Sequence, residues 1–239
     1  YGKLHKNKQN YTEAKKCLLQ SIEFGNGEAL YEYAKILLKG TQTDTKEALY
    51  YLQKSIDKNC LQAMYKYGCI LLNEDKKDDG LRFIQMAANK GYPKALYHYS
   101  SILEKDEKNE GFTECSTKAS KYLFEAAQKG HVKAMHKYAL YLLNNAHNQN
   151  NNNNNDDNSK ILNESLLYMK KASDKGDIDS IYQYGKILLD NYDDQKNCEK
   201  GATYFKIAAD NGHSDSMNKY AEINIKGKGV YVNTKKAIK

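Results

Sequence analysis

Histidine and acidic side chains are the residues of this sequence that could carry acid–base chemistry or bind a metal ion. The six histidines are scattered, and His131 and His136 stand five residues apart, so they do not share a helix face as two ligands of one ion would. The acidic pairs Asp78-Asp79 and Asp193-Asp194 fall in expected turns between helices, where solvation explains them. We therefore expect neither a metal site nor a cofactor.

Catalytic and phosphate-binding motifs are absent from the sequence. It contains no GxxxxGK[ST], GxGxxG, HExxH or GxSxG pattern. The five cysteines form no CxxC pair, and an odd, scattered set is typical of a reducing compartment; they are Cys17, Cys60, Cys69, Cys115 and Cys198. We predict no catalytic residue, a chain that is not an enzyme, and a cytoplasmic location. No stretch approaches the 18 apolar residues of a membrane-spanning helix, so we expect no membrane insertion.

Basic side chains are the remaining candidates for binding. The formal net charge is +7, and all basic residues except Arg82 are lysines, which disfavours nucleic acid as a partner because specific readers rely on arginine forks. Five basic side chains occupy equivalent places in an internal repeat, and we predict that they bind a protein or an acidic peptide. They are Lys66, Lys94, His98, Lys133 and Lys137. The alternative interpretation is an ordinary solvated helix face.

The repeat that positions these residues is the main signal in the chain. Six similar segments begin at an anchor residue that is glycine or asparagine, and the spacing between successive anchors varies from 32 to 46 residues. The anchors are Gly25, Asn59, Gly91, Gly130, Gly176 and Gly212. Glycine and asparagine tolerate the left-handed conformation that ends a helix, so each anchor predicts a helix C-cap.

The segment after each anchor predicts one helix, here named the A helix. Counting from the anchor, positions +4 and +9 hold small residues, +5 and +12 hold mostly Leu, Met or Ile, and +8 is always Tyr. This spacing defines one face of an α-helix. We expect the small residues to allow close approach of a neighbouring helix and the tyrosine to fill the space beside them. The predicted basic residues lie at +3 and +7, away from this face.

The segment before each anchor predicts a second helix, the B helix. Bulky residues stand eight and seven positions before the anchor, and a small residue stands four before it. The only proline, Pro93, comes two residues after an anchor, where it can begin an A helix without losing a hydrogen bond. Six such helix pairs, each unable to bury its apolar face alone, predict an all-α solenoid of stacked repeats.

This pattern resembles the Sel-one-like repeat family, a branch of the tetratricopeptide-like α-solenoids. The residues that carry the resemblance are the Ala-Ala-x-x-Gly endings at 87–91, 126–130 and 208–212, and the Gly-x-Gly-Val loop at 227–230 followed by Asn233 and Lys236-Ala237. The resemblance covers essentially the whole chain. It implies a right-handed superhelix without catalytic activity of its own, acting as a scaffold or adaptor. Some members of the family are associated with the endoplasmic reticulum.

An asparagine-rich run interrupts the fourth spacing between anchors, which is the longest at 46 residues. It covers residues 147–158, between an A helix expected to end near Asn145 and a B helix expected to begin near Ile161, and its composition predicts disorder. A shorter insertion, Asp106–Cys115, falls in the equivalent loop of the preceding repeat. We treat residues 1–239 as a single solenoid of about six repeats. The chain begins and ends partway through a repeat, so we expect it to be a fragment of a longer protein.

Three functions remain open on the sequence. The first is a non-catalytic scaffold that binds a partner along the A helices, which line the concave surface of related solenoids. The second is a regulatory solenoid attached to a catalytic domain outside this segment, such as a kinase. The third is an RNA-binding helical array, which the irregular repeat spacing and the absence of a recurring base-reading pair disfavour.

Overall fold

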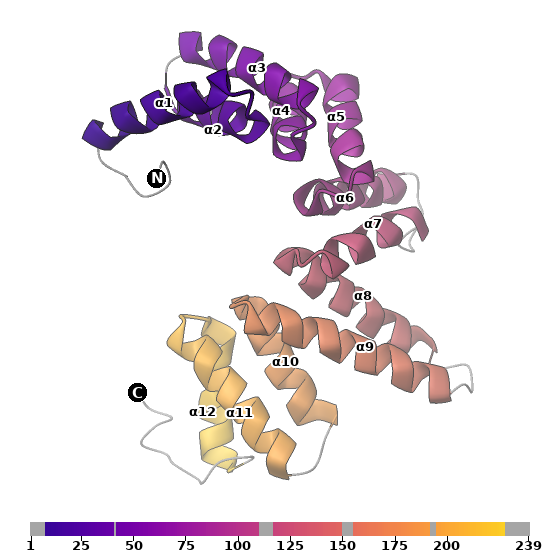
Figure 1. The fold of residues 1–239 in the computed structure, drawn as a ribbon. Coiled ribbons are helices and arrows are strands. Elements are labelled where there is room, and N and C mark those ends of the chain that lie inside the picture. Colours follow the sequence, from indigo (N-terminus) through magenta and orange to yellow (C-terminus); the bar gives the residue numbers. More distant parts are fainter. Residues whose placement is uncertain (1–7, 41, 110–116, 150–154, 192–194, 228–239) are drawn as a thin grey trace. The chain divides into compact units, whose positions relative to one another are not determined.

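The computed structural model describes residues 8–40, 42–109, 117–149, 155–191 and 195–227. These described residues form twelve α-helices and no strand, which confirms the all-α prediction (Figure 1). The helices are α1 (Lys8–Glu23), α2 (Gly27–Leu37), α3 (Gln42–Asp57), α4 (Leu61–Asn73), α5 (Lys77–Asn89), α6 (Pro93–Asn109), α7 (Thr117–Gln128), α8 (Val132–Gln149), α9 (Asn155–Asp174), α10 (Ile178–Asn191), α11 (Gln195–Asp210) and α12 (Ser214–Lys226). Even-numbered helices are the A helices of the repeat and odd-numbered helices are the B helices.

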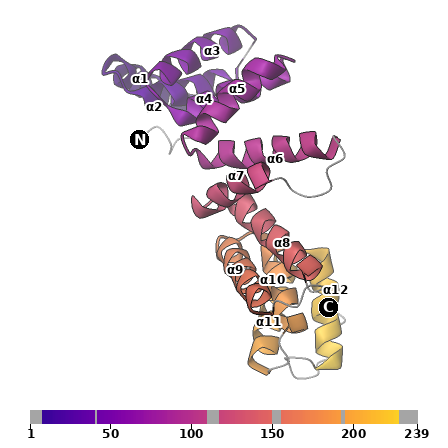
Figure 2. The ribbon, with the colours of Figure 1, turned by 90° about the vertical axis from the view of Figure 1, so that its right-hand side faces the viewer.

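The chain divides into two compact units, residues 1–122 and 123–239, with the border inside α7. Within the first unit, each helix from α1 to α6 packs against the next in sequence, and within the second unit α8 to α12 do the same. The antiparallel run of α9, α10 and α11 is visible in both views (Figures 1 and 2). Packing of helices against their sequence neighbours is the architecture of an α-solenoid, as predicted.

The anchor residues end their helices as predicted. All six have positive φ, from 59° at Asn59 to 87° at Gly212. In each case the backbone N–H of the residue after the anchor donates to the carbonyl five residues earlier, as Cys60 does to Ser55 at 3.1 Å. This bond is the signature of the Schellman motif, which satisfies carbonyl groups that the helix leaves free.

The small residues of the A helices allow close helix contact, as predicted. Position +4 is buried in all six repeats, and its residues are Ala29, Ala63, Ala95, Ala134, Ser180 and Ser216. At +9, a Cβ atom added to Gly68 of α4 would lie 2.9 Å from the carbonyl oxygen of Gly80 in α5. A Cβ atom on Gly185 of α10 would lie 3.1 Å from the carbonyl oxygen of Gly201 in α11.

The small residue that the B helix contributes to this contact was not predicted from the sequence. Gly80 and Gly201 stand eleven residues before an anchor, and the same position is small and buried in every repeat. Its other members are Ala14, Ala48, Ala119 and Ser165. In the second unit, the hydroxyl of Ser165 donates to the backbone carbonyl of Ala139 at 3.0 Å, across the same contact. In these three cases the A helix is therefore packed closely against the backbone of the B helix that follows it.

One edge-to-face aromatic pair joins each of the first five A helices, α2 to α10, to the B helix that follows it. The tyrosine at +8 meets the aromatic residue eight before the next anchor, with ring centroids between 4.8 and 5.1 Å apart. The five pairs are Tyr33–Tyr51, Tyr67–Phe83, Tyr99–Tyr122, Tyr138–Tyr168 and Tyr184–Tyr204. Pairs of this geometry contribute about 0.5–1.5 kcal/mol each beyond the area that they bury.

Three local predictions need correction. Asp78-Asp79 lie in the first turn of α5, not in a turn between helices, and carboxylates there interact favourably with the helix dipole. Met217, expected in the core at +5, is 49% exposed. Helices α8 and α9 run to Gln149 and from Asn155, so each extends further into the asparagine-rich run than expected.

Several predictions fall on residues outside the described ranges. These include the centre of the asparagine-rich run at 150–154, most of the second insertion at 110–116, Asp193-Asp194 and the loop and helix start after Gly227. The predicted disorder of the run stays a prediction. Pro93 is the first residue of α6, as expected.

Candidate interaction surface

Neighbouring A helices meet along a line of polar and aromatic side chains that we name the A seam. It consists of the residue at +6 of one A helix and the residue at +1 of the next. In the first unit, the ring centroids of Tyr65 and Tyr92 lie 5.6 Å apart. In the second unit, His136 Nδ1 lies 3.5 Å from Asp177 Oδ2, and the ring centroids of Tyr182 and His213 lie 4.7 Å apart. The seam repeats wherever two A helices are adjacent within a unit.

The first unit adds a cysteine and a histidine to this seam. The Cys69 Sγ lies 3.9 Å from Nδ1 of His98, whose ring meets Tyr65 edge-on at 5.8 Å. Burial raises the pKa of the Tyr65 hydroxyl, and the neighbouring Cys69 adds to the rise. Burial also lowers the pKa of His98, and the positive charge of Lys105 lowers it further. The cluster is therefore neutral at physiological pH and offers aromatic surface with a few hydrogen-bonding atoms.

Cys69 is expected to react slowly with alkylating reagents. Burial raises the pKa of its thiol, more than the Tyr65 hydrogen bond and the Lys66 charge lower it, so the reactive thiolate is scarce at neutral pH. Cys17, which is exposed on α1, serves as the internal comparison. Mass spectrometry after timed iodoacetamide treatment of the folded chain should show Cys17 modified first. Equal rates for the two residues would contradict this expectation.

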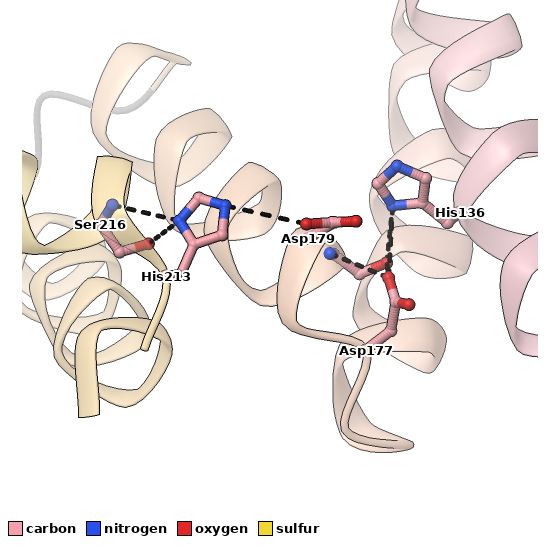
Figure 3. Close-up of polar contacts among 6 residues, drawn as sticks. His136, Asp177, Asp179, His213 and Ser216 are labelled. Carbon is pink, nitrogen blue, oxygen red and sulfur yellow. Dashed lines mark hydrogen bonds and ion pairs between the residues drawn. The ribbon is translucent and has the colours of Figure 1, made fainter. Parts of the chain in front are cut away.

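The second unit places two N-caps in the seam (Figure 3). The carboxylate Oδ2 of Asp177 accepts from the backbone N–H of Ser180 at 3.0 Å and from its hydroxyl at 2.5 Å, so it caps α10. The ring Nδ1 of His213 accepts from the backbone N–H of Ser216 at 3.1 Å, so it caps α12. Side-chain caps of this kind stabilise a helix by about 1 kcal/mol.

The hydrogen bonds also fix the histidine tautomers. Nδ1 of His213 is an acceptor, so its proton is on Nε2, which faces Asp179 Oδ1 at 3.7 Å. His136 Nδ1 lies 2.8 Å from the Ser180 hydroxyl oxygen. Since that hydroxyl donates to Asp177, Nδ1 of His136 is the donor to it.

His136, Ser180 and Asp177 have the residue types of a hydrolase triad but not its geometry. In a triad, serine and aspartate contact opposite ring nitrogens of the histidine. Here both approach the same atom, Nδ1, and the serine donates to the aspartate directly. Ser180 is also 0% exposed, so no substrate can reach its hydroxyl. The arrangement connects α8 to the N-terminus of α10 and performs a structural role.

The five predicted partner-binding residues are divided between the two units. Lys66, Lys94 and His98 lie in the first unit, on α4 and α6. Lys94 is exposed, while Lys66 and His98 are partly buried, and His98 belongs to the seam cluster around Tyr65. Lys133, exposed, and Lys137, partly buried, lie in the second unit on α8. Their role in binding stays a prediction.

The seam residues themselves were not predicted from the sequence. A signal was present, because position +6 is aromatic or histidine in five of the six repeats: Tyr31, Tyr65, Tyr97, His136 and Tyr182. Position +1 varies in type and shows no comparable pattern. The described residues contain no group of three or more His, Cys, Asp or Glu side chains that could hold a metal ion. None of the helices in the described ranges has the length and apolar character needed to cross a membrane.

The model of the Sel1 repeat family matches five segments of the chain: 27–60, 61–92, 162–177, 178–213 and 214–239. The chain belongs to the Sel1 repeat family. The matched Sel1 segments cover more than half of the sequence. Three of them, 27–60, 61–92 and 178–213, each contain one A helix and the B helix that follows it, and α6–α8 lie between the two matched groups. Sel1 repeats generally serve as scaffolds for protein interactions.

Solved structures support the Sel1 solenoid fold. A Sel1 repeat protein from Oxalobacter formigenes superposes with a TM-score of 0.70 at 21% identity, over 95% of this chain and 91% of that one. The protein c5321, a protective antigen of uropathogenic Escherichia coli with the same repeat fold, superposes with a TM-score of 0.68 at 15% identity, over 95% of this chain and 47% of that one. No sequence among the curated proteins matches this Sel1 chain.

Proposed function

We propose that this Sel1 chain is a non-catalytic scaffold that binds a partner protein or peptide along its A helices. The observation that carries the proposal is the A seam, a row of partly exposed aromatic and histidine side chains bordered by lysines. Aromatic side chains are enriched at protein interfaces because they offer a large contact area with few rotatable bonds. The lysines beside them favour a partner with acidic residues.

Lysines beside the seam would mainly affect how a partner peptide is oriented and how fast it associates. Exposed ion pairs contribute about 0.2–1 kcal/mol each, so no single lysine decides binding. Several together steer an acidic peptide towards the aromatic surface. The proposed contributors are Lys66 and Lys94 in the first unit and Lys133 and Lys137 in the second. His98, which is neutral at physiological pH, would instead contribute its ring and a hydrogen bond.

A charge-reversal variant tests this proposal. Peptides are first selected on the wild-type chain from a random displayed library, and their affinities are then measured for Lys66→Glu/Lys133→Glu/Lys137→Glu. We expect a loss of about tenfold or more, the scale of three summed surface pairs. The melting temperature should change little, because surface substitutions usually alter stability by less than about 0.5 kcal/mol.

The matched control reverses three exposed lysines of the B helices, Lys46, Lys121 and Lys206, and so changes the net charge equally. The control should bind like the wild type. If both triple variants weaken binding to the same extent, the effect is one of net charge and the A helices are not the site. If neither weakens it, the proposed surface is wrong.

We also propose that the chain works in a reducing compartment such as the cytoplasm. In support, the cysteines within the described residues, Cys17, Cys60, Cys69 and Cys198, form no disulfide with one another. Reduced and oxidised samples of the chain should therefore have the same melting temperature.

A further inference from the structure

A cavity of about 490 Å³ opens in the second unit between the B helices α9 and α11, over the A helix α10. Its floor contains the edge-to-face pair Tyr184–Tyr204, with ring centroids 4.8 Å apart, and the buried side chain of Ile181. Ile207, which is 41% exposed, lies at its rim. The volume lies within the range of small-ligand sites, and the lining is apolar with a few charged groups, as is usual for such sites. None of these residues belongs to the A seam.

The preceding repeat shows which side chain fits this place. There the equivalent tyrosine pair is Tyr138–Tyr168, at 5.1 Å and the same interplanar angle of 89°. The ring of Phe124, six residues before its anchor, packs on both members, with centroids 5.0 Å from Tyr138 and 6.3 Å from Tyr168. A phenyl ring of the chain itself therefore covers the aromatic pair in that repeat.

In the repeat with the cavity, the residue equivalent to Phe124 is Lys170. Its ammonium group pairs with Asp174 on the same helix, with Nζ 2.6 Å from Oδ2. A lysine held in this pair does not cover the ring pair as a phenyl group does, and the space over Tyr184 and Tyr204 is left open. The cavity thus has the aromatic floor of a phenylalanine site and lacks the phenylalanine.

The charges around the cavity indicate which groups of a ligand should flank its phenyl ring. The lining carries two lysines, Lys170 and Lys200, and one carboxylate, Asp174, which Lys170 already neutralises. Lys200 is exposed and has no ion-pair partner among the described residues. We propose that the cavity binds a phenylalanine side chain of a partner peptide in which carboxylates flank the phenylalanine. None of its lining residues belongs to the A seam, so the chain presents a second docking surface.

Fluorescence anisotropy with a labelled peptide Gly-Asp-Phe-Asp-Gly and the full chain tests the proposal. We expect saturable binding at micromolar to millimolar concentrations, and at least a tenfold loss when alanine replaces the phenylalanine of the peptide. The substitution Lys170→Phe should fill the cavity from within, as Phe124 does in the preceding repeat, and abolish binding. Lys200→Glu, at an exposed position, should weaken binding about two- to fivefold, the scale of one exposed ion pair.

Three comparisons keep the outcome decisive. Lys196→Phe adds the same ring to α11 at an exposed position outside the cavity and should bind like the wild type. The triple reversal on the A helices should also leave this peptide's affinity unchanged, which separates this site from the scaffold proposal. The proposal is overturned if the peptide does not bind by about 1 mM, if its alanine version binds equally well, or if both Lys170→Phe and Lys200→Glu bind like the wild type.

Discussion

Gly68→Val is expected to destabilise the first unit by about 3 kcal/mol or more, the upper end of the cost of overpacking. The reason is that even a single Cβ atom at this position would lie 2.9 Å from both the Gly80 carbonyl oxygen and the Ile84 side chain. A backbone carbonyl cannot rotate away as a side-chain end can, so α4 and α5 would have to separate. Separation would also break the Tyr67–Phe83 pair, whose centroids are 4.9 Å apart.

Hydrogen exchange followed by mass spectrometry measures this effect helix by helix. Amides of α4 and α5 should lose protection, while those of α10 to α12 in the second unit should keep theirs. Asn73→Val, at an exposed position near the end of the same helix, is the control and should cost less than about 0.5 kcal/mol. Unchanged protection of α4 and α5 in Gly68→Val would show that the close helix contact does not limit residue size.

Phe205→Ala is expected to destabilise the second unit by about 3–5 kcal/mol, the usual cost of emptying a large aromatic site in a core. Phe205 is 0% exposed and lies in a cluster with Leu189, Cys198, Ala202 and Ile223. The ring of Tyr182 meets it edge-on, with centroids 5.5 Å apart. Removal of the phenyl ring leaves a cavity where α10, α11 and α12 meet.

Phe24→Ala is the matched control for this substitution, since it removes the same side chain from a position that is 90% exposed. Its free energy of unfolding should stay within about 0.5 kcal/mol of the wild type. Urea titration by circular dichroism should resolve the two variants clearly. A cost below about 1 kcal/mol for Phe205→Ala would mean that the surrounding helices collapse into the space.

The features of the fold that depend on local sequence were predictable. A left-handed C-cap requires glycine or asparagine, and all six anchors adopt positive φ, including Asn59 at 59°. The small residues at +4 and +9 were predictable as contact positions because they share one helix face with the larger core residues. In these cases one helix alone carries the signal.

The contacts between repeats were harder to predict. A seam pair such as His136 and Asp177 joins helices separated by the asparagine-rich run, so its spacing differs from that of Tyr65 and Tyr92. The N-cap at +1 can be asparagine, aspartate or histidine, and chemically different residues perform the same role there. The cavity beside Lys170 was not predictable from the sequence. It arises because lysine stands where the preceding repeat has Phe124, and this difference leaves a space only because the Tyr184–Tyr204 pair lies beside it.

Asn224 shows how the helix context changes the role of a residue. It occupies position +12, where the other five repeats have leucine, and is 2% exposed. Its side-chain amide donates to the backbone carbonyl of Tyr220 at 2.7 Å, one turn earlier in the same helix. The hydrogen bond within the helix satisfies the amide donor, so the polar residue can occupy an apolar position at a reduced cost.

The recurring tyrosine-to-aromatic pair has a consequence for how this chain could change in length over evolution. Each pair joins an A helix to the B helix that follows it, and all five have nearly the same geometry. Both members of a pair lie between the same two anchors, so duplication or deletion of a segment from one anchor to the next adds or removes one complete pair. The number of repeats, and with it the length of the surface offered to partners, can therefore change in whole steps while every remaining aromatic pair stays complete.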